Sequence, residues 1–292
     1  MLKHSISESA LRRDGLHINA AGLVEPGEKS RADGKILSAV TDGVGVITFN
    51  NPAKRNAMSL EMWEGLGHAL VELRDDPDVR VVILVGAGDK AFVSGADISQ
   101  FEKTRHNAEA SEEYSKRSAA QRALLADYPK PTIACIRGFC LGGGMQVAML
   151  ADIRFAAENS QFGIPAAKLG IAYGYDGLRN LVSLVGPSWA RLIMYTGMKI
   201  DSAEALRIGL VDRVSPDAEL WDATMEIART ISGNAPLAIK AAKITIAQVL
   251  KDPDQRDKKA IKEIGTVCMD SEDFREGRRA FMEKRKPNFT GR

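Results

Sequence analysis

Three consecutive glycines, Gly142–Gly144, separate an apolar segment with the character of a strand from one with the character of a helix. The expected strand covers residues 132–136, Gly138 ends it, and the apolar helical run spans 145–150. Glycines at such a bend remove every side chain, so that a ligand can touch bare backbone. The first amides of a helix lack partners within it and lie at the positive end of its dipole. The junction therefore suits an anion or a developing oxyanion, or else it is a tight turn where two backbones cross.

A second glycine-containing bend, residues 86–98, leaves the apolar strand expected at 79–85 and also precedes a helical segment. Gly95 permits a sharp turn there, and Asp97 stands where it would cap the helix that follows. Two such bends, each leaving a buried strand for a helix, could aim one N–H each at a common point.

The composition is that of an ordinary globular protein. The chain has 292 residues, of which 45% are hydrophobic and 27% charged, with a net charge of +2. That charge gives no reason to expect nucleic acid or a membrane as a partner, and no apolar run reaches the roughly 18 residues of a spanning helix. We expect one large domain or two, no secretory signal and a cytoplasmic location.

The cysteine and histidine residues show no metal-binding pattern. The cysteines are odd in number and are expected to be reduced core residues of an intracellular protein: Cys135, Cys140 and Cys268. The histidines are scattered, and none lies at a ligand spacing or beside either bend: His4, His17, His68 and His106. We therefore expect neither a metal site nor a histidine-based catalytic triad.

Hydrophobic patterning predicts α/β layers followed by a mainly helical C-terminal part. Residues 1–34 are polar and weakly patterned, so we expect a flexible extension, with a subunit-contact arm as the alternative. Ser59 is expected to cap an amphipathic helix that continues through Leu73. The other strands are expected at 36–40, 44–49 and 153–156, and the later helices at 187–196, 202–208, 217–231, 237–250 and within 254–286.

Five motifs, in order, resemble those of the enoyl-CoA hydratase/isomerase (crotonase) superfamily, over a span from about Lys35 to Gly291. They are NPAKRNAM at 51–58, AFVSGADI at 91–98, RGFCLGGG at 137–144, DSAEALRIGLV at 201–211, and EDFREG at 272–277 followed by FMEKR at 281–285. The resemblance implies an α/β fold, with a spiral of ββα turns over residues 35–200 that holds the CoA and active site. It also implies a helical subdomain over 201–292 that supports homotrimers or hexamers.

The resemblance assigns roles to individual residues. The amides of Ala96 and Gly143 would form an oxyanion hole for the carbonyl of an acyl-CoA thioester, which agrees with the two bends. Lys54 and Arg55 would contact the pantetheine and phosphate region of CoA, and Lys284 would reach a CoA phosphate, in some relatives across a subunit boundary. The other substrate-contact residues so implied are Ala57, Asp97, Ile98, Leu141 and Phe281. For the three cations the alternative is a solvated surface, and for Phe281 it is core packing.

The chain departs from the hydratases of this family at both catalytic glutamate positions. Gln146 stands two residues after the third glycine, and Ala166 follows the proline that ends the segment 161–165. Glutamine exchanges no proton near neutral pH, and alanine has no polar side-chain atom. Since general acid–base catalysis contributes ~100- to 10,000-fold per group, orthodox hydration would be handicapped, whereas the expected oxyanion hole is intact.

The segment 169–178 is the most unusual part of the chain. Hydratases of the family commonly have Pro-Gly-x-Gly-Gly here, whereas this chain has Tyr173, Tyr175 and Asp176. The spacing resembles the methylmalonyl-CoA decarboxylase branch, in which a tyrosine matching Tyr173 lies at the active site, although that branch has histidine in place of Ala96. Core packing for the tyrosines and helix capping for Asp176 are the alternatives.

These observations favour an acyl-CoA enzyme of the enoyl-CoA hydratase/isomerase type that works through a stabilised thioester enolate. Decarboxylation of a malonyl- or methylmalonyl-type CoA is the alternative reaction, because it needs an oriented carboxylate and a stabilised enolate but no base. Tyr173 would orient that carboxylate, whereas an inward Asp176 would transfer protons beside a water held by Gln146. A non-catalytic CoA- or RNA-binding protein of the same fold is the alternative of another class. We expect no bound cofactor, with CoA present only as part of the substrate.

Overall fold

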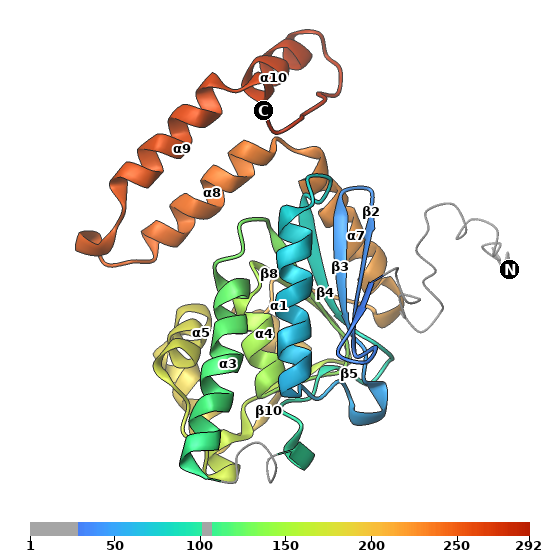
Figure 1. The fold of residues 1–292 in the computed structure, drawn as a ribbon, viewed down its shortest axis with the longest axis vertical. Coiled ribbons are helices and arrows are strands. Elements are labelled where there is room, and N and C mark those ends of the chain that lie inside the picture. Colours follow the sequence, from blue (N-terminus) through green and yellow to red (C-terminus); the bar gives the residue numbers. More distant parts are fainter. Residues whose placement is uncertain (1–28, 101–106) are drawn as a thin grey trace, which may run out of the picture.

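The computed structural model describes residues 29–100 and 107–292, and its largest element is a seven-stranded sheet (Figure 1). The strands lie in the order β1-β2-β3-β4-β6-β8-β11. Their bounds are β1 (Lys29–Arg31), β2 (Ile36–Thr41), β3 (Val44–Phe49), β4 (Val81–Gly86), β6 (Thr132–Ile136), β8 (Ile153–Ala157) and β11 (Arg213–Ser215). The pairings β1–β2 and β2–β3 are antiparallel and the others are parallel, so the strands predicted from apolar runs form the centre of one mixed sheet.

A second, smaller sheet shows how the chain coils. Its order is β10-β9-β7-β5, and its strands are β5 (Ala91–Val93), β7 (Phe139–Leu141), β9 (Gln161–Gly163) and β10 (Lys199–Asp201). After β4, β6 and β8 the chain adds a strand to the small sheet and then forms a helix, which gives repeated ββα turns. The α/β fold class and the spiral implied by the resemblance are thus confirmed. Patterning alone missed the three-residue strands, because alternation needs a longer run to stand out.

Alternation along the buried strands sends their side chains into two separate cores. On β4, Val82 and Leu84 lie in the larger core, whereas Val81 and Ile83 lie in the smaller core on the opposite face. A continuous apolar run therefore marks a strand covered on both sides. The larger core is closed by α1 (Leu60–Asp75), α3 (Ala108–Ala126) and α4 (Gly143–Leu150), and the smaller one by α7 (Leu220–Gly233) (Figure 1).

Two helices show how local signals act. The Ser59 hydroxyl accepts a hydrogen bond from the Met62 amide at 3.2 Å, so the predicted cap of α1 is confirmed. Helix α5 spans Tyr175–Thr196 but breaks at Gly186, whose φ of 72° lies outside the helical region. Sequence patterns predicted bounds only for the second half of α5, from Pro187 onward, with a helix start at Asp176 as an alternative.

The C-terminal helices form an arm that extends away from the two sheets (Figure 1). This C-terminal arm, residues 236–292, contains α8 (Pro236–Val249), α9 (Lys258–Asp270) and α10 (Glu272–Met282), which confirms the helices predicted there. The shorter helical elements are α6 (Ser202–Arg207) and the 3-10 turns η1 (Pro52–Lys54), η2 (Ile98–Gln100), η3 (Pro165–Leu169), η4 (Asp217–Glu219) and η5 (Pro253–Gln255). Within the two described ranges, no helix is long and apolar enough to cross a bilayer.

A short edge strand lies inside the region expected to be a flexible extension. Lys29–Arg31 forms β1 and pairs with Ile36–Ser38 of β2, so residues 29–34 do not belong to an extension over 1–34. The polar side chains of β1 hide it from sequence patterns, because edge strands carry charge and show little hydrophobic alternation. The rest of that expectation, including a subunit-contact arm, concerns residues 1–28 and lies outside the described residues.

Candidate active site

The Ala96 amide points away from Met58, the residue that forms hydrogen bonds with Gly95 and Asp97 on either side of it. The Gly95 carbonyl oxygen accepts a hydrogen bond from the Met58 amide at 2.8 Å, and the Asp97 amide donates to the Met58 carbonyl oxygen at 2.9 Å. The peptide bond between Gly95 and Ala96 is trans, so its N–H points opposite to its C=O. The Ala96 N–H therefore points away from Met58, and it donates no hydrogen bond among the described residues.

The Gly143 amide points out of the beginning of helix α4. Gly143 is the first residue of that helix, and the preceding Gly142 carbonyl oxygen accepts from the Gln146 amide at 3.1 Å along the helix. The trans peptide between Gly142 and Gly143 directs the Gly143 N–H the opposite way, at the positive end of the helix dipole. Within residues 29–100 and 107–292 no carbonyl oxygen accepts from it. The Gly142 amide, by contrast, is bonded to the Gly163 carbonyl oxygen at 2.9 Å, which ties the bend to the small sheet.

The two bends lie against each other. A β-carbon built on Gly143 would lie 3.6 Å from the Ala96 nitrogen. Gly142 has a φ of 50°, and a β-carbon on Gly144 would clash with the Val93 carbonyl oxygen, so these two positions require glycine. A β-carbon on Gly143 would meet only ordinary contacts, but it would stand beside the Ala96 amide. The Gly143 backbone and the Ala96 nitrogen thus lie close together, and neither N–H has an acceptor among the described residues.

Buried Asn56 holds the loop of residues 51–58 against the chain that leads into the first bend. Its side-chain amide donates to the carbonyl oxygens of Ala87 and Ala91 at 2.9 and 2.7 Å, and its side-chain oxygen accepts from the Asn51 amide at 2.9 Å. Asn56 has a φ of 57°, which asparagine adopts more readily than most residues. Sequence patterns assigned Asn56 no role, and the available signal was its place inside the motif NPAKRNAM.

Lys54 and Asp97, both expected to contact CoA, form an ion pair with each other. The Lys54 ammonium lies 2.8 Å from Asp97 Oδ2 and donates to the Ser99 hydroxyl at 2.8 Å. Asp97 Oδ1 accepts from the Ser99 amide at 3.2 Å, so Asp97 caps the turn η2 as predicted. Burial by itself would raise the pKa of Asp97, but the ammonium and the Ser99 hydrogen bonds outweigh it and hold the pKa below its ordinary value.

Arg55 lies on the exposed side of the same loop. Its guanidinium carbon is 5.4 Å from the ring centroid of Phe139, and the Lys199 ammonium is 5.0 Å from the same centroid. Two cations therefore gather around one half-buried aromatic ring, where an anionic group would find both. Sequence patterns missed Lys199, because only the pairing of the small sheet brings β10 toward β7. Of the other residues assigned to substrate contact, Ala57 is buried, Leu141 is half-buried and Ile98 is 58% exposed.

The side chains of Tyr173 and Gln146 both lie close to Gly177. A β-carbon on Gly177 would lie 3.3 Å from the Tyr173 ring and 3.6 Å from the side-chain nitrogen of Gln146. Since Gln146 lies one turn along α4 from Gly143, the tyrosine stands beside the same end of that helix. The ring packs against the larger core, and this burial raises the pKa of the hydroxyl to about 12. The phenol is therefore neutral near pH 7 and can donate a hydrogen bond, but it cannot act as a base.

The other residues of the unusual segment face solvent. Tyr175 is 76% exposed, and Asp176 is exposed in the first turn of α5. The N-cap of α5 is Gly174, so the alternative of Asp176 as the cap is wrong. Ala166 is buried in the turn η3, where its carbonyl oxygen accepts from the Ile171 amide at 3.0 Å. The arrangement thus leaves Asp176 as a surface carboxylate.

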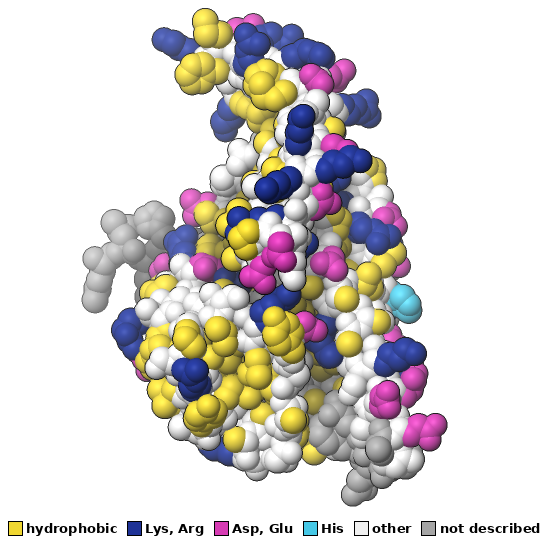
Figure 2. Space-filling model, turned by 90° about the vertical axis from the view of Figure 1, so that its left-hand side faces the viewer, with side chains coloured by type: hydrophobic (Ala, Val, Ile, Leu, Met, Phe, Trp, Pro, Cys, Tyr) yellow, Lys and Arg dark blue, Asp and Glu magenta, His cyan; other side chains and the backbone are white. Residues whose placement is uncertain are grey.

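An apolar groove of about 370 Å³ opens beside Tyr173. Both halves of α5 line it, with Leu178 and Val182 on the first half and Ala190 and Met194 on the second. Figure 2 shows hydrophobic side chains gathered over this part of the molecule, below the C-terminal arm. Such a groove suits an apolar group.

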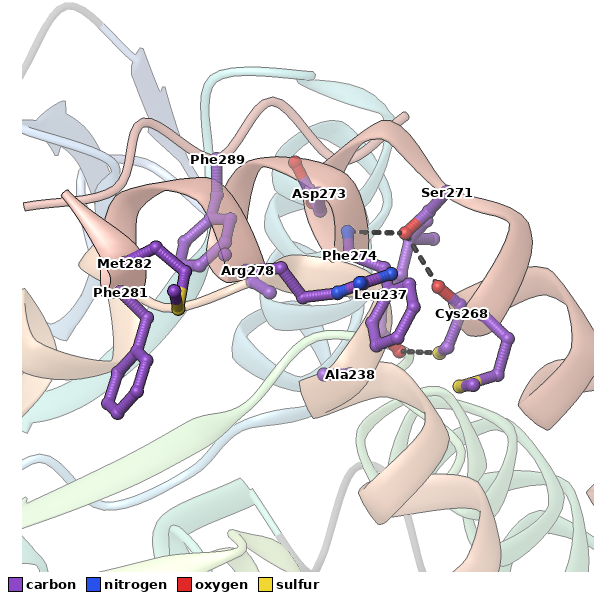
Figure 3. Close-up of a pocket in the computed structure, with 13 residues that line it drawn as sticks. Leu237, Ala238, Cys268, Ser271, Asp273, Phe274, Arg278, Phe281, Met282 and Phe289 are labelled. Carbon is purple, nitrogen blue, oxygen red and sulfur yellow. Dashed lines mark hydrogen bonds between the residues drawn. The ribbon is translucent and has the colours of Figure 1, made fainter.

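Phe281 and Lys284 lie at the other end of the molecule from the two bends. Helix α10 is in the tip of the C-terminal arm, whereas β5, which leads into the Ala96 bend, lies at the far end of the sheets (Figure 1). Phe281 is 82% exposed and, with Met282 and Phe289, lines an apolar concavity of about 760 Å³ in the arm (Figure 3). Within one chain, neither Phe281 nor Lys284 reaches the bends.

The three cysteines are free thiols. Cys135 and Cys140 are buried in the two cores, and burial raises the pKa of the Cys135 thiol to about 11. Cys268 is half-buried in the C-terminal arm. In the described part of the chain, no three His, Cys, Asp or Glu side chains are grouped so as to hold a metal ion.

Known proteins match this arrangement along nearly the whole chain. The family model described as enoyl-CoA hydratase/isomerase matches residues 39–292. The short-chain-enoyl-CoA hydratase of Clostridium acetobutylicum is 37% identical over 243 residues, which cover 83% of this chain and 92% of that protein. The crotonyl-CoA hydratase of Syntrophomonas wolfei is 35% identical and covers 87% of this chain and 97% of its own length.

Solved structures agree with these sequence matches. An enoyl-CoA hydratase/carnithine racemase from Magnetospirillum magneticum has a TM-score of 0.85 at 34% identity, covering 90% of this chain and 97% of that one. The enoyl-CoA hydratase of Bacillus anthracis has a TM-score of 0.83 at 32% identity, covering 88% of this chain and 100% of that one. The chain belongs to the enoyl-CoA hydratase/isomerase family and is an enzyme of the hydratase/isomerase type. The membership predicted from the five motifs is confirmed.

Proposed function

We propose that this protein binds an acyl-CoA thioester and stabilises its enolate with the amides of Ala96 and Gly143. The observation that carries the proposal is the close approach of the two bends, since a β-carbon on Gly143 would lie 3.6 Å from the Ala96 nitrogen, and neither N–H has an acceptor among the described residues. Donors fixed in advance stabilise an oxygen that gains negative charge during the reaction. A thioester oxygen gains such charge when C2 loses a proton or a carboxylate. CoA enters only as part of the substrate.

Side chains near the bends favour a reaction that depends little on acid–base help. Gln146 and Ala166 stand where the resemblance places the two glutamates of hydration, and neither exchanges a proton near neutral pH. Addition of water to an enoyl thioester would therefore need another proton carrier. Asp176 is the carboxylate of the neighbouring segment, and it would have to turn inward from its exposed position to serve.

Decarboxylation of a malonyl-type CoA is the second candidate, and Tyr173 favours it. A neutral phenol beside the first turns of α4 can donate a hydrogen bond to a substrate carboxylate. Loss of CO2 leaves the electron pair of the broken bond on C2, where it is conjugated with the thioester as the enolate, and this step needs no base. The exposed position of Asp176 also lessens its repulsion of the substrate carboxylate.

Product analysis in water labelled with heavy oxygen distinguishes these reactions. Crotonyl-CoA and methylmalonyl-CoA would be incubated with the protein and the products identified by chromatography and mass spectrometry. Label in the product identifies hydration, a shifted double bond without a mass change identifies isomerisation, and loss of CO2 identifies decarboxylation. Tight binding of CoA with no turnover of a broad thioester panel would contradict the proposal and favour a non-catalytic binding protein.

We further infer that copies of the chain associate through the C-terminal arm. Several apolar side chains of the arm are exposed in one chain: Ile246, Val249, Leu250, Val267, Met269, Phe281 and Met282. The concavity in Figure 3 adds an apolar surface that a second copy would cover. Burying such surface contributes roughly 25 cal/mol per Å².

Association of this kind would bring Phe281 and Lys284 close to a neighbouring copy, which is how they would act on substrate. We expect Phe281→Asp to lower the mass found by analytical ultracentrifugation toward that of a single chain. A wild-type protein that sediments as a monomer, or a variant that still assembles fully, would contradict the inferred role of the arm.

A further inference from the structure

The ion pair of Lys54 and Asp97 joins the bend that carries the Ala96 amide to a loop much earlier in the chain. The two residues are 43 positions apart, and Lys54 Nζ lies 2.8 Å from Asp97 Oδ2. The same nitrogen donates to the Ser99 hydroxyl at 2.8 Å. The ammonium therefore binds the chain immediately after the amide proposed to hold the thioester oxygen.

The Asp97 carboxylate needs this partner because it is buried. Its side chain is 8% exposed, whereas that of Lys54 is 49% exposed. Ser99 supplies only neutral donors to the carboxylate, through its amide and its hydroxyl. Removing one member of a buried ion pair leaves an uncompensated charge, which is more costly than the pair is stabilising. Without the ammonium, we expect the carboxylate to turn toward water and to pull residues 96–99 with it.

Movement of Asp97 would change the direction of the Ala96 N–H. The Met58 amide donates to the Gly95 carbonyl oxygen and so orients the peptide that carries the Ala96 N–H, and the Asp97 amide donates to the Met58 carbonyl oxygen and so orients the next peptide. Lys54 and Met58 belong to the same loop, so the ion pair and these main-chain bonds hold the bend from one side. A displacement of about 1 Å at a catalytic group can cost about 100-fold in rate. Loss of the Lys54–Asp97 ion pair would therefore lower the rate by displacing the Ala96 N–H.

We propose that Lys54 is a positioning residue that neutralises Asp97 and thereby keeps the Ala96 amide aimed at the thioester oxygen. The proposal rests on the proposed function, which gives the Ala96 amide its role. It differs from the phosphate contact that the family resemblance assigns to Lys54. A positioning residue acts on the electronic state of the bound thioester, whereas a phosphate contact acts on the affinity for CoA.

Acetoacetyl-CoA is a probe that separates these two roles. This thioester loses a proton from C2 to solvent, and its enolate is recognised by near-ultraviolet absorbance. The ratio of enolate to keto form in the bound ligand thus reports the donors at the thioester oxygen without any turnover. Because the ratio is measured on bound ligand, a loss of folded protein does not change it. The affinity for CoA, measured by calorimetry, reports the contacts to phosphate.

Matched variants of the full chain make the comparison specific. Lys54→Met removes the cation, Lys54→Arg keeps a cation, and the double variant Lys54→Met/Asp97→Asn removes both charges. Lys90→Met is the control, because Lys90 is an exposed lysine within the same bend. Within the part of the chain that the structure describes, the Lys90 side chain makes no hydrogen bond or ion pair.

We expect Lys54→Met to lower the enolate ratio by about 10- to 100-fold, while the Kd for CoA changes by less than about threefold. Lys54→Arg and the double variant should recover part of the ratio, and Lys90→Met should match the wild type. A weaker affinity for CoA with an unchanged enolate ratio would overturn the proposal and assign Lys54 to phosphate binding. No enolate enrichment in the wild type would instead overturn the proposed function, and this inference with it.

Discussion

The two bends and the Tyr173 segment contribute groups of opposite kinds to one candidate site. At the bends the groups are main-chain amides, and hydrogen bonds to Met58 and from Gln146 set their directions. In residues 171–177 the groups are side chains, and Tyr175 and Asp176 stand exposed at the start of α5. The difference shows that hydrogen bonds hold the main chain at the bends, whereas Tyr175 and Asp176 are exposed to solvent. Under the proposed function, the fold therefore arranges the groups for oxyanion stabilisation more strictly than those for proton transfer. Changes at the bends should therefore have the larger effects.

Replacing Gly143 with proline should have the largest effect, because it removes one of the two main-chain donors at the bends. Proline lacks the N–H but is tolerated at the first position of a helix, so α4 should form while one donor is lost. We expect kcat for the acyl-CoA substrate to fall by about 100- to 1,000-fold, with circular dichroism showing a folded protein. Ala96→Gly keeps its N–H and should retain most of the activity. Equal turnover in Gly143→Pro and the wild type would contradict the assignment.

Alanine substitutions at the adjacent residues Gly143 and Gly144 distinguish an effect on turnover from an effect on stability. A β-carbon on Gly144 would clash with the Val93 carbonyl oxygen, whereas one on Gly143 would find its nearest neighbour at 3.5 Å. We expect Gly144→Ala to lower the free energy of unfolding in urea by about 1–3 kcal/mol or more, and Gly143→Ala to stay close to the wild type in stability. Gly143→Ala should still lower turnover, because its methyl group would stand beside the Ala96 amide. If both variants were equally stable, the close packing of the two bends would be wrong.

Removing the Tyr173 hydroxyl tests the contribution of the second region, residues 171–177. If the phenol orients a substrate carboxylate, Tyr173→Phe loses a hydrogen bond to a charged group, which contributes ~1.5–3 kcal/mol and hence about 10- to 100-fold in rate. We expect that loss in kcat/KM for methylmalonyl-CoA and a much smaller one for crotonyl-CoA. Equal losses with both thioesters would show that Tyr173 acts through packing alone.

The pH dependence of stability tests the burial of the same hydroxyl. The folded pKa of Tyr173 is raised from 10.0 to about 12, so between these values the folded state keeps a proton that the unfolded state has lost. The associated stability is fully present below pH 10 and is lost as the pH rises through about 12. Over that range, the free energy of unfolding of the wild type should fall more steeply than that of Tyr173→Phe. Parallel curves would mean that the hydroxyl is solvated.

The smallest effect is expected at Asp176. Because this carboxylate is exposed and does not cap α5, Asp176→Asn should change the free energy of unfolding by no more than about 0.5 kcal/mol and kcat by no more than about twofold. Steady-state kinetics across the acid range provides the measurement. A large fall in kcat, together with loss of an acidic limb in the pH profile, would show that Asp176 turns inward and carries protons.

The long elements of the fold could be predicted because their signals are local. The apolar run Val79–Val85 and the Ser59 cap each depend on a few adjacent residues, and both appear in the structure, as β4 and at the start of α1. The glycines at 142 and 144 were informative for the same reason, since φ and close backbone approach exclude side chains at those residues. The three-residue strands of the small sheet carry too little pattern, and only the family resemblance implied them.

Contacts inside the candidate site depend on tertiary structure, and sequence patterns missed most of them. Nothing in the two motifs shows that the Lys54 ammonium meets Asp97 rather than a phosphate, because the two residues are 43 positions apart. The approach of Tyr173 and Gln146 to Gly177 likewise requires α5 to begin at Tyr175, and no side-chain cap in the sequence marks that start. Features formed by the local main chain were thus predictable, whereas the tertiary partners of polar side chains in the candidate site were not.

A crystal structure of the protein with acetoacetyl-CoA bound tests the central claim most directly. We predict that the thioester oxygen lies about 2.7–3.1 Å from both the Ala96 and the Gly143 nitrogen. A thioester oxygen bound to only one of these nitrogens, or to neither, would contradict the claim that the two bends form one oxyanion site.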